Sequence, residues 1–420
     1  MCLWNGLSLL LKTMIMSTPT KVVLDGTLFA ECQMQGSNRD GMMRLTEDIT
    51  QNLVLDPDLE ITFASSLYIH KYDRALKNFI HSHYPNHQDK IFSNSPVYLS
   101  NILKWKNLFR TYLFTIPIYP FYKEINNNHV FHSFYYPFSS SVLKNKIKKS
   151  ITFLDIIALK IDGYPKDLVQ RTKQVVDSIA GNFAISISDY SKQDLLNFDP
   201  RIKEENIFVV PLAASKELFY QNKDLNDWET VKKKYALPEK YFLTVAGNDA
   251  RKNVRTIILA FCNFLEQEKF KDIHLVLAGN NIHNRKMLDE LNVSPGLRKH
   301  IYISNVFIDS KDLAVLYSNA LCFFFISLYE GFGLPALEAM QCGTPTVVSN
   351  TTSLPEVVGN AAIQITPTDI NEVSSAMLEI YTNENLRARY AAAGMERAKQ
   401  FSWQKSADNY SKIFQEISLR

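Results

Sequence analysis

Short apolar segments alternate with amphipathic segments along most of this chain of 420 residues. The apolar segments are rich in Val, Ile, Leu, Phe and Tyr, which is typical of strands buried on both faces of a parallel sheet. In the first half of the chain we expect strands at 21–25, 60–65, 130–136, 150–157, 184–188 and 207–212. In the second half we expect strands at 241–246, 274–279, 301–307, 321–326 and 346–348.

The segments between these strands carry apolar residues at helical spacing. The clearest helices are expected at 43–53, 254–270, 313–317 and 404–419. Strands that alternate with helices predict an α/β fold with parallel sheets. Because the pattern restarts at Tyr241, we expect two Rossmann-like domains that face each other, with the ligand in the cleft at the carboxyl ends of the strands.

Composition narrows the class of protein. Hydrophobic residues make up 46% and charged residues 21%, as in an ordinary globular protein, and a net charge of +3 is too small to indicate nucleic-acid binding. The five cysteines are scattered without metal-ligand spacing, which favours reduced thiols and a cytoplasmic location. No segment reads as a membrane span, and we expect residues 1–19 to be a poorly ordered or over-long start, or a weak membrane-touching segment.

One stretch, 323–346, combines an apolar strand, a glycine loop, a short helix and a second strand. Pro335 suits the first turn of the helix and Gly343 suits its end. The backbone N–H groups of Gly333 and Leu334 therefore lie at a helix N-terminus, which favours anions and phosphate above all.

Two carboxylates, Glu330 and Glu338, lie in this stretch with seven residues between them. Taken separately, one would be a loop acid near the helix start and the other a solvated helix residue. Together, in the sequence EGFGLPALEAMQCGTPTV, they resemble the E-x7-E signature of the family-4 retaining glycosyltransferases, and the loop acid is positioned to accept hydrogen bonds from sugar hydroxyls.

Further segments support this resemblance, which covers about residues 20–419. Gly41 and Arg44 match a glycine loop of the family, Lys252 matches a lysine that meets the donor phosphates, and 353–359 reads SLPEVVG as in the family. The chain departs from the family pattern at Leu154, where many members have histidine, and at Asn248, where many have arginine.

The resemblance implies the GT-B fold, with an acceptor domain over 20–216, a donor domain over 217–403 and a terminal helix, 404–420, that crosses back to the first domain. It implies a nucleotide-diphospho-sugar as substrate, no cofactor and no metal, with catalytic roles for Glu330 and Lys252. The donor-binding residues that it implies are Arg251, Gly331, Phe332, Gly333, Leu334, Glu338, Gly247, Phe307 and Gly41. On the acceptor side, Asp155 and His132 are candidates, although a lone histidine is more often structural.

The acceptor is expected to be a glycan or a lipid-linked saccharide used in surface polysaccharide biosynthesis. Aromatic and basic residues interleave over 103–121, and lysines cluster at 144–149, so a peripheral contact with an anionic membrane is one reading and a core helix with solvated lysines is the other. Mannose from a guanosine donor is our first choice of sugar. The rival functions are a GT-B pseudo-enzyme that only binds nucleotide sugar and a sugar-nucleotide epimerase.

Overall fold

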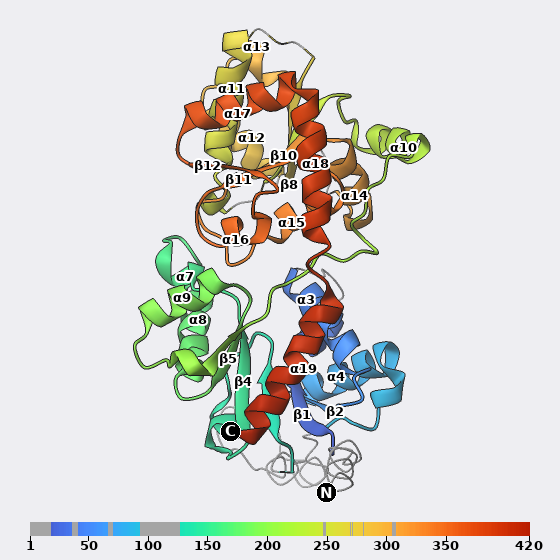
Figure 1. The fold of residues 1–420 in the computed structure, drawn as a ribbon, viewed down its shortest axis with the longest axis vertical. Coiled ribbons are helices and arrows are strands. Elements are labelled where there is room, and N and C mark those ends of the chain that lie inside the picture. The colour runs from blue at the N-terminus through green and yellow to red at the C-terminus, as the bar shows by residue number, and fades with distance from the viewer. Residues whose placement is uncertain are drawn as a thin grey trace, which may run out of the picture.

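The computed structural model describes residues 18–35, 41–65, 70–92, 127–246, 249–268, 270, 272–279, 281–304 and 308–420. These residues form two lobes, each built on a six-stranded sheet flanked by helices (Figure 1). Every strand pair within the described part of the two sheets is parallel. The α/β class and the parallel sheets predicted from the apolar pattern are therefore confirmed.

The first lobe has the strand order β2-β1-β3-β4-β5-β6. Its strands are β1 (Thr20–Asp25), β2 (Leu59–Ala64), β3 (Val130–Ser133), β4 (Lys148–Phe153), β5 (Phe183–Ser186) and β6 (Ile207–Val209). Its helices are α2 (Thr27–Gln35), α3 (Gly41–Leu53), α4 (His70–His83), α6 (Ser140–Lys144), α7 (Ile157–Lys160), α8 (Lys166–Ile179) and α9 (Asp189–Phe198).

The second lobe has the strand order β12-β11-β10-β7-β8-β9. Its strands are β7 (Tyr241–Ala246), β8 (His274–Gly279), β9 (Ile301–Ile303), β10 (Cys322–Phe325), β11 (Thr346–Ser349) and β12 (Ile363–Ile365). Its helices are α10 (Leu225–Tyr235), α11 (Val254–Glu268), α12 (Asn281–Glu290), α13 (Pro295–Arg298), α14 (Ser310–Asn319), α15 (Leu334–Gln341), α16 (Leu354–Val358), α17 (Ile370–Thr382) and α18 (Glu384–Ala398).

The terminal helix α19 (Trp403–Leu419) leaves the second lobe and packs against the first (Figure 1). The hydroxyl of Ser402 caps its start by accepting from the Lys405 N–H. Ser406 Oγ then donates to the Pro211 carbonyl at 2.7 Å, and the hydroxyls of Tyr410 and Thr152 lie 2.7 Å apart. The predicted crossing of the last helix is confirmed.

Several expected strands are shorter in the structure. The strand expected at 150–157 ends at Phe153, and helix α7 begins at Ile157, because Asp155 Oδ1 accepts from the Ile157 N–H and turns the chain there. Helix α2 was not expected, since its apolar residues lack a clear helical stripe.

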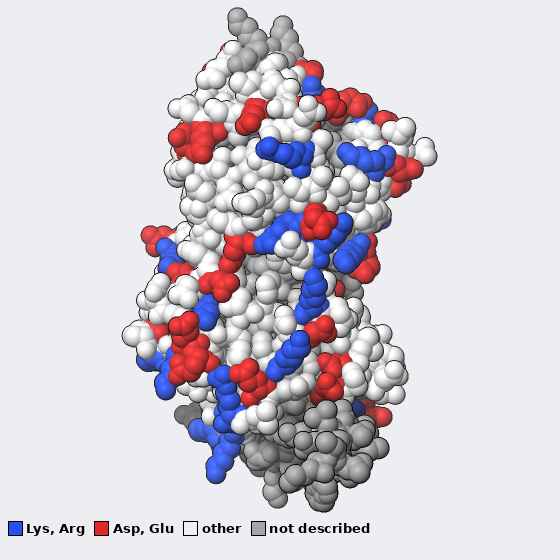
Figure 2. All heavy atoms as spheres, viewed as in Figure 1, with Lys and Arg blue, Asp and Glu red and all other residues white. Residues whose placement is uncertain are grey.

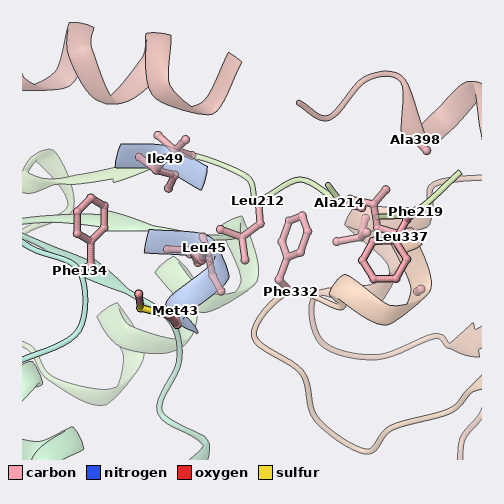
Figure 3. Packing of buried hydrophobic residues seen from close by; sticks show 14 of the residues in the cluster. Met43, Leu45, Ile49, Phe134, Leu212, Ala214, Phe219, Phe332, Leu337 and Ala398 are labelled. Carbon is pink, nitrogen blue, oxygen red and sulfur yellow. The ribbon is translucent and has the colours of Figure 1, made fainter. Parts of the chain in front are cut away.

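The two lobes share a continuous hydrophobic cluster (Figure 3). Phe332, from the glycine loop of the second lobe, is 4% exposed and lies between Leu212 and Leu337. Leu212 belongs to the segment that connects the lobes, and Leu337 lies on α15. Phe332 therefore anchors the loop in the core between the lobes, where a ligand could not reach its buried ring.

On the surface, acidic and basic side chains are interspersed on the face that Figure 2 presents. The exposed charged side chains of α19 alternate in sign along the helix: Lys405, Asp408, Lys412 and Glu416. Arg420 follows at the end of the helix. Among the described helices, none is both long and apolar enough to cross a bilayer.

Candidate active site

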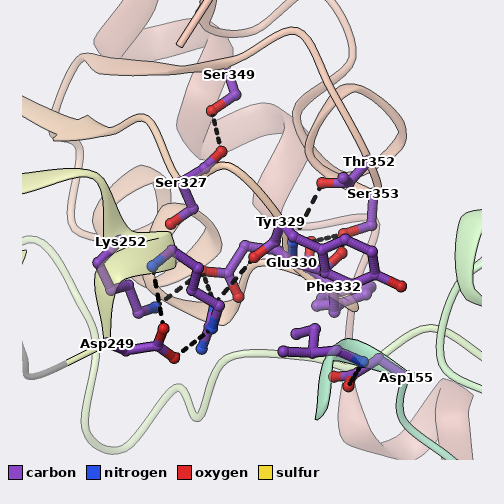
Figure 4. Close-up of polar contacts among 12 residues, drawn as sticks. Asp155, Asp249, Lys252, Ser327, Tyr329, Glu330, Phe332, Ser349, Thr352 and Ser353 are labelled. Atoms are coloured by element: carbon purple, nitrogen blue, oxygen red, sulfur yellow. Dashed lines mark hydrogen bonds and ion pairs between the residues drawn. The ribbon is translucent and has the colours of Figure 1, made fainter. Parts of the chain in front are cut away.

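The centre of the site is the loop that joins β10 to α15. Gly333 has φ +119°, and a Cβ there would lie 2.5 Å from Leu354 Cδ2, so glycine is required for the turn into the helix. Ser353 Oγ donates to the carbonyl oxygens of Glu330 and Phe332, at 2.9 and 2.8 Å, and so fixes the loop (Figure 4). In the first turn of α15 the Ala336 N–H donates to the Gly333 carbonyl at 3.0 Å, whereas the Leu334 N–H precedes any acceptor within the helix.

Two cations contact the loop carboxylate (Figure 4). Lys252 Nζ lies 2.9 Å from Glu330 Oε1, and Arg251 Nη1 lies 2.5 Å from the same oxygen. Arg251 also donates to the Tyr329 carbonyl at 3.1 Å, and the Lys252 ammonium lies 4.5 Å from the centre of the Phe325 ring. The turn Ala250–Lys252 thus brings both predicted cations to the predicted catalytic carboxylate.

The electrostatics of this cluster follow from its burial. Burial would raise the pKa of the Glu330 carboxyl, but Lys252 and Arg251 outweigh it and hold that pKa below its usual range. Burial lowers the pKa of the Lys252 ammonium, while Glu330 opposes the shift. The anion beside Lys252 in this structure is therefore Glu330, so a cation in this loop does not by itself require a phosphate.

Asp249 connects this cluster to the other lobe. Its Oδ2 accepts from Arg251 Nε at 2.6 Å and from the hydroxyl of Tyr164, in the first lobe, at 2.8 Å. Burial and this bond to Asp249 raise the pKa of Tyr164 to about 12, so the phenol stays protonated and remains a donor. We did not predict either residue, although Asp249 follows strand β7, where the carboxyl-end rule could have found it.

Glu338 lies on α15 and is 8% exposed. Its Oε2 accepts from the Tyr317 hydroxyl at 3.4 Å, and its Oε1 lies 4.0 Å from Arg44 Nη1 on α3 of the first lobe. Burial raises its pKa to about 7, because Arg44 is too distant to offset the loss of solvent. The pKa of Glu330 is thus lowered and that of Glu338 is raised, although both residues lie on one short segment.

Gly331, in the glycine loop of the second lobe, lies close against the first lobe. A Cβ at this position would lie 2.8 Å from both Asp155 Oδ2 and the Leu154 carbonyl oxygen. The Gly331 carbonyl accepts from Ser188 Oγ at 2.7 Å and from Ser191 Oγ at 3.1 Å. Ser188 is the N-cap of α9 and Ser191 lies in its first turn, and their contact with the glycine loop was not predicted.

Asp155 lines a cavity of about 310 Å³ between the lobes, which we call the cleft cavity. Arg251 and Asp249 form part of its wall on the second lobe, and the remaining wall comes from the first lobe. Burial raises the pKa of Asp155 to about 6. Asp155 therefore lies beside both the glycine loop and an open volume, which suits its predicted place on the acceptor side.

His132 is not in the cleft. Its side chain is wholly buried, with Nδ1 2.8 Å from Ser150 Oγ, Nε2 3.1 Å from Thr152 Oγ1, and the rings of Tyr410 and Phe414 around it. Burial lowers its pKa to about 3. An acceptor cannot reach this imidazole, so the acceptor role is wrong for His132 and the structural role is the one that fits.

The remaining predicted residues lie partly in the site and partly outside the described residues. Gly41 begins α3, the helix that carries Arg44 towards Glu338. Gly247 and Phe307 lie outside the described residues. Within the described part of the chain, no three His, Cys, Asp or Glu side chains are grouped closely enough to hold a metal ion.

Comparison with known proteins agrees with this geometry. Residues 227–397 match the family model "Glycosyl transferases group 1". The chain is 33% identical to the O-antigen chain mannosyltransferase B of Escherichia coli over 267 residues, which cover 62% of this chain and 69% of that protein. It is 31% identical over 223 residues to the serotype-specific mannosyltransferase WbdA of Escherichia coli, a match that covers 53% of this chain and 27% of WbdA.

Solved structures share the architecture. Sucrose-phosphate synthase from Thermosynechococcus elongatus superposes with a TM-score of 0.65 at 17% identity, covering 94% of this chain and 98% of the other. Anabaena Alr3699/HepE in complex with UDP and glucose gives 0.63 at 14% identity, covering 94% and 99%. Two facing parallel sheets with a terminal helix that crosses back define the GT-B fold of glycosyltransferases. The chain belongs to the group 1 glycosyltransferases.

Proposed function

We propose that this glycosyltransferase transfers mannose, with retention of configuration, from a guanosine diphosphate donor to a growing surface polysaccharide. The observation that carries the proposal is the convergence of Lys252, Arg251 and Glu330 beside the N-terminus of α15, within the matched family region. The sugar rests on similarity to mannosyltransferases of O-antigen chains.

The proposed donor rests on the charges of the cluster formed by Lys252, Arg251 and Glu330. Breaking a sugar–phosphate bond leaves negative charge on the diphosphate, and preorganised cations and N–H groups stabilise that charge in the transition state. Lys252 and the α15 N-terminus supply these groups, while Arg251, with five N–H donors, can hold Glu330 and a phosphate together. Glu330 is kept ionised by both cations and accepts hydrogen bonds from the sugar hydroxyls.

Glu338 is proposed to hold the ribose. Its carboxyl lies beside the Tyr317 hydroxyl and close to Arg44 of the first lobe, so a ribose there would contact both lobes. We propose that no metal ion takes part, because the cations of the chain compensate the diphosphate charge. Transfer that persists in excess EDTA would support this point, and transfer restored only by added Mg²⁺ or Mn²⁺ would contradict it.

The acceptor is proposed to be a glycan on a lipid carrier at the cytoplasmic face of a membrane. Lys144 and Lys146 are exposed, but Lys149 is buried and donates to the carbonyls of Asn145 and Ile147, so it is unavailable to a surface. The aromatic and basic segment with Lys104, Lys106 and Arg110 lies outside the described residues, and its membrane role stays a prediction.

A panel of nucleotide sugars tests the proposal directly. A bound donor at about 100 times its dissociation constant should stabilise the folded protein by about 2.7 kcal/mol, measured as a rise in unfolding temperature. GDP-mannose should give the largest rise and should be consumed with an acceptor, and the anomeric proton of the product should show the α configuration of the donor. Binding without transfer or hydrolysis would favour the pseudo-enzyme, and a changed sugar without acceptor would favour the epimerase.

A further inference from the structure

The cleft cavity is lined by apolar side chains together with polar groups from both lobes. Its volume of about 310 Å³ lies at the lower end of the range for ligand sites, which suits one or two sugar rings rather than a longer saccharide. Leu154, Ile157, Leu168 and Val175 contribute apolar surface, as the C–H face of a pyranose requires.

One end of the cavity lies at the donor loop. There Asp155, Asp249 and the Tyr164 hydroxyl line the wall, and Arg251 contacts both the cavity and Glu330. A hydroxyl group bound at this end would lie next to the sugar that Glu330 holds. This end therefore suits the hydroxyl that accepts the transferred sugar.

Arg171 and Tyr135 line the other part of the wall, on the first lobe. Arg171 Nη1 donates to the Tyr135 hydroxyl at 3.1 Å, and the guanidinium lies 5.3 and 5.4 Å from the ring centres of Tyr135 and Tyr136. In the described part of the chain Arg171 forms no ion pair, whereas Arg251 is held by two carboxylates. A guanidinium has five N–H donors, so the stacked and oriented group retains donors for a ligand.

We infer that the cleft cavity binds the terminal sugar of a neutral glycan acceptor, and that Arg171 is the residue that recognises its hydroxyl groups. The inference rests on the proposed function and assigns its acceptor side. A neutral sugar is favoured over an anion because two arginines and two aspartates line the cavity, so their charges balance and the aspartates oppose a phosphate or a carboxylate.

The test uses the full-length enzyme with GDP-mannose and a panel of neutral methyl glycosides of mannose, glucose, galactose and rhamnose. With the best of these acceptors, Arg171→Ala should raise the acceptor KM about ten- to a hundredfold, as expected for lost hydrogen bonds to a charged donor. Donor hydrolysis and the donor KM should stay within about twofold of wild type. Lys173→Ala, an exposed position on the same helix, is the matched control and should change neither KM.

A second variant covers the case in which Arg171→Ala does not fold. Leu168→Trp fills the cavity from a half-buried position on α8, so it should block transfer while donor hydrolysis continues. An unchanged acceptor KM in both variants, or donor hydrolysis by the wild type without transfer to any neutral glycoside, would overturn this inference but not the proposed function. Preference for a phosphorylated glycoside that is lost in Arg171→Ala would also overturn it, in favour of an anionic acceptor. Wild-type protein that neither hydrolyses nor transfers from any nucleotide sugar would overturn the proposed function as well.

Discussion

The donor loop and the cleft cavity lie side by side but are assembled in different ways. The loop from Tyr329 to Gly333 is one short segment, and its partners Arg251 and Lys252 come from a single neighbouring turn at the same edge of the sheet. The cavity draws Tyr135, Asp155 and Arg171 from three separate elements of the first lobe and closes only against the second lobe. Contiguous segments can be recognised in a sequence, whereas a wall built from distant segments exists only once the chain has folded.

The two carboxylates of the donor segment also differ in charge pairing. Glu330 has two cations within hydrogen-bonding distance, so its pKa is depressed, whereas Glu338, eight positions along the chain, has a hydroxyl and one distant arginine, so its pKa is raised. The arginines differ in the same way. Arg251, at the donor loop, is paired with Asp249 and Glu330, whereas Arg171, in the cavity wall, forms no ion pair among the described residues and keeps donors for hydrogen bonding.

The largest effect is expected from Lys252→Ala. Removing one charged group that stabilises the transition state typically costs about 2.7–4 kcal/mol, so turnover should fall by about two orders of magnitude or more. The fold should persist, because Arg251 still pairs with Glu330. Steady-state kinetics with GDP-mannose measures the change, and the exposed Lys286→Ala is the control. An unchanged kcat/KM would show that the Lys252 side chain does not contact the donor phosphates.

The raised pKa of Glu338 predicts a pH dependence of stability. In the folded protein this carboxyl has a pKa of about 7, against 4.5 in its ordinary state, so between these values the folded state binds the proton more tightly. Its contribution is therefore fully present below about pH 4.5 and is lost as the pH rises through 7, by on the order of 3 kcal/mol.

Denaturant unfolding of wild type and Glu338→Gln at pH 5 and pH 8 measures this contribution. Relative to wild type, Glu338→Gln should have a higher free energy of unfolding at pH 8 than at pH 5. The variant Glu379→Gln, at an exposed position on α17, is the control for the loss of a carboxylate. Parallel pH profiles for Glu338→Gln and wild type would show that the buried carboxyl does not titrate in this range.

Gly331→Ala tests the contact between the donor loop and the cavity wall. The new Cβ would lie 2.8 Å from Asp155 Oδ2 and the Leu154 carbonyl, so the lobes must separate or the loop must shift, at about 1–3 kcal/mol. We expect a lower unfolding temperature and transfer reduced at least tenfold. Gly296→Ala is the matched control, since a Cβ there meets nothing within 4 Å. If both variants behave as wild type, the close approach of the lobes is not needed for transfer.

A smaller effect is expected from Glu338→Gln on nucleotide binding. An amide can still accept from the ribose but with less strength than a carboxylate, so affinity for GDP should fall about tenfold. Because this contact forms in the ground state and in the transition state, kcat should change less than KM. Calorimetric titration with GDP measures it, and equal affinity would show that Glu338 has no contact with the nucleotide.

The smallest effect concerns the surface of the first lobe. Each exposed lysine near an anionic bilayer contributes about 1 kcal/mol, so Lys146→Ser should weaken binding to anionic liposomes about fivefold at low salt. Lys149→Ser should not weaken binding in this way, because that ammonium already donates to Asn145 and Ile147. Cosedimentation at low and high salt measures both. Wild-type protein that ignores anionic liposomes would exclude the membrane contact.

Much of the donor side was determined by the sequence itself. Strands β7 and β8 begin and end at the predicted residues, because their apolar runs are bounded by polar and glycine residues. Pro335 and Gly343 predicted the short helix that the structure has as α15, since local turn chemistry decides where it starts and ends.

Only the tertiary structure decided the partners of these residues. It gave Lys252 a carboxylate as its anion, it buried His132 beneath α19, and it brought Ser188 and Ser191 to the Gly331 carbonyl. Burial, pKa shifts and contacts between lobes depend on elements far apart in the chain, and a local pattern carries no information about which of them will meet.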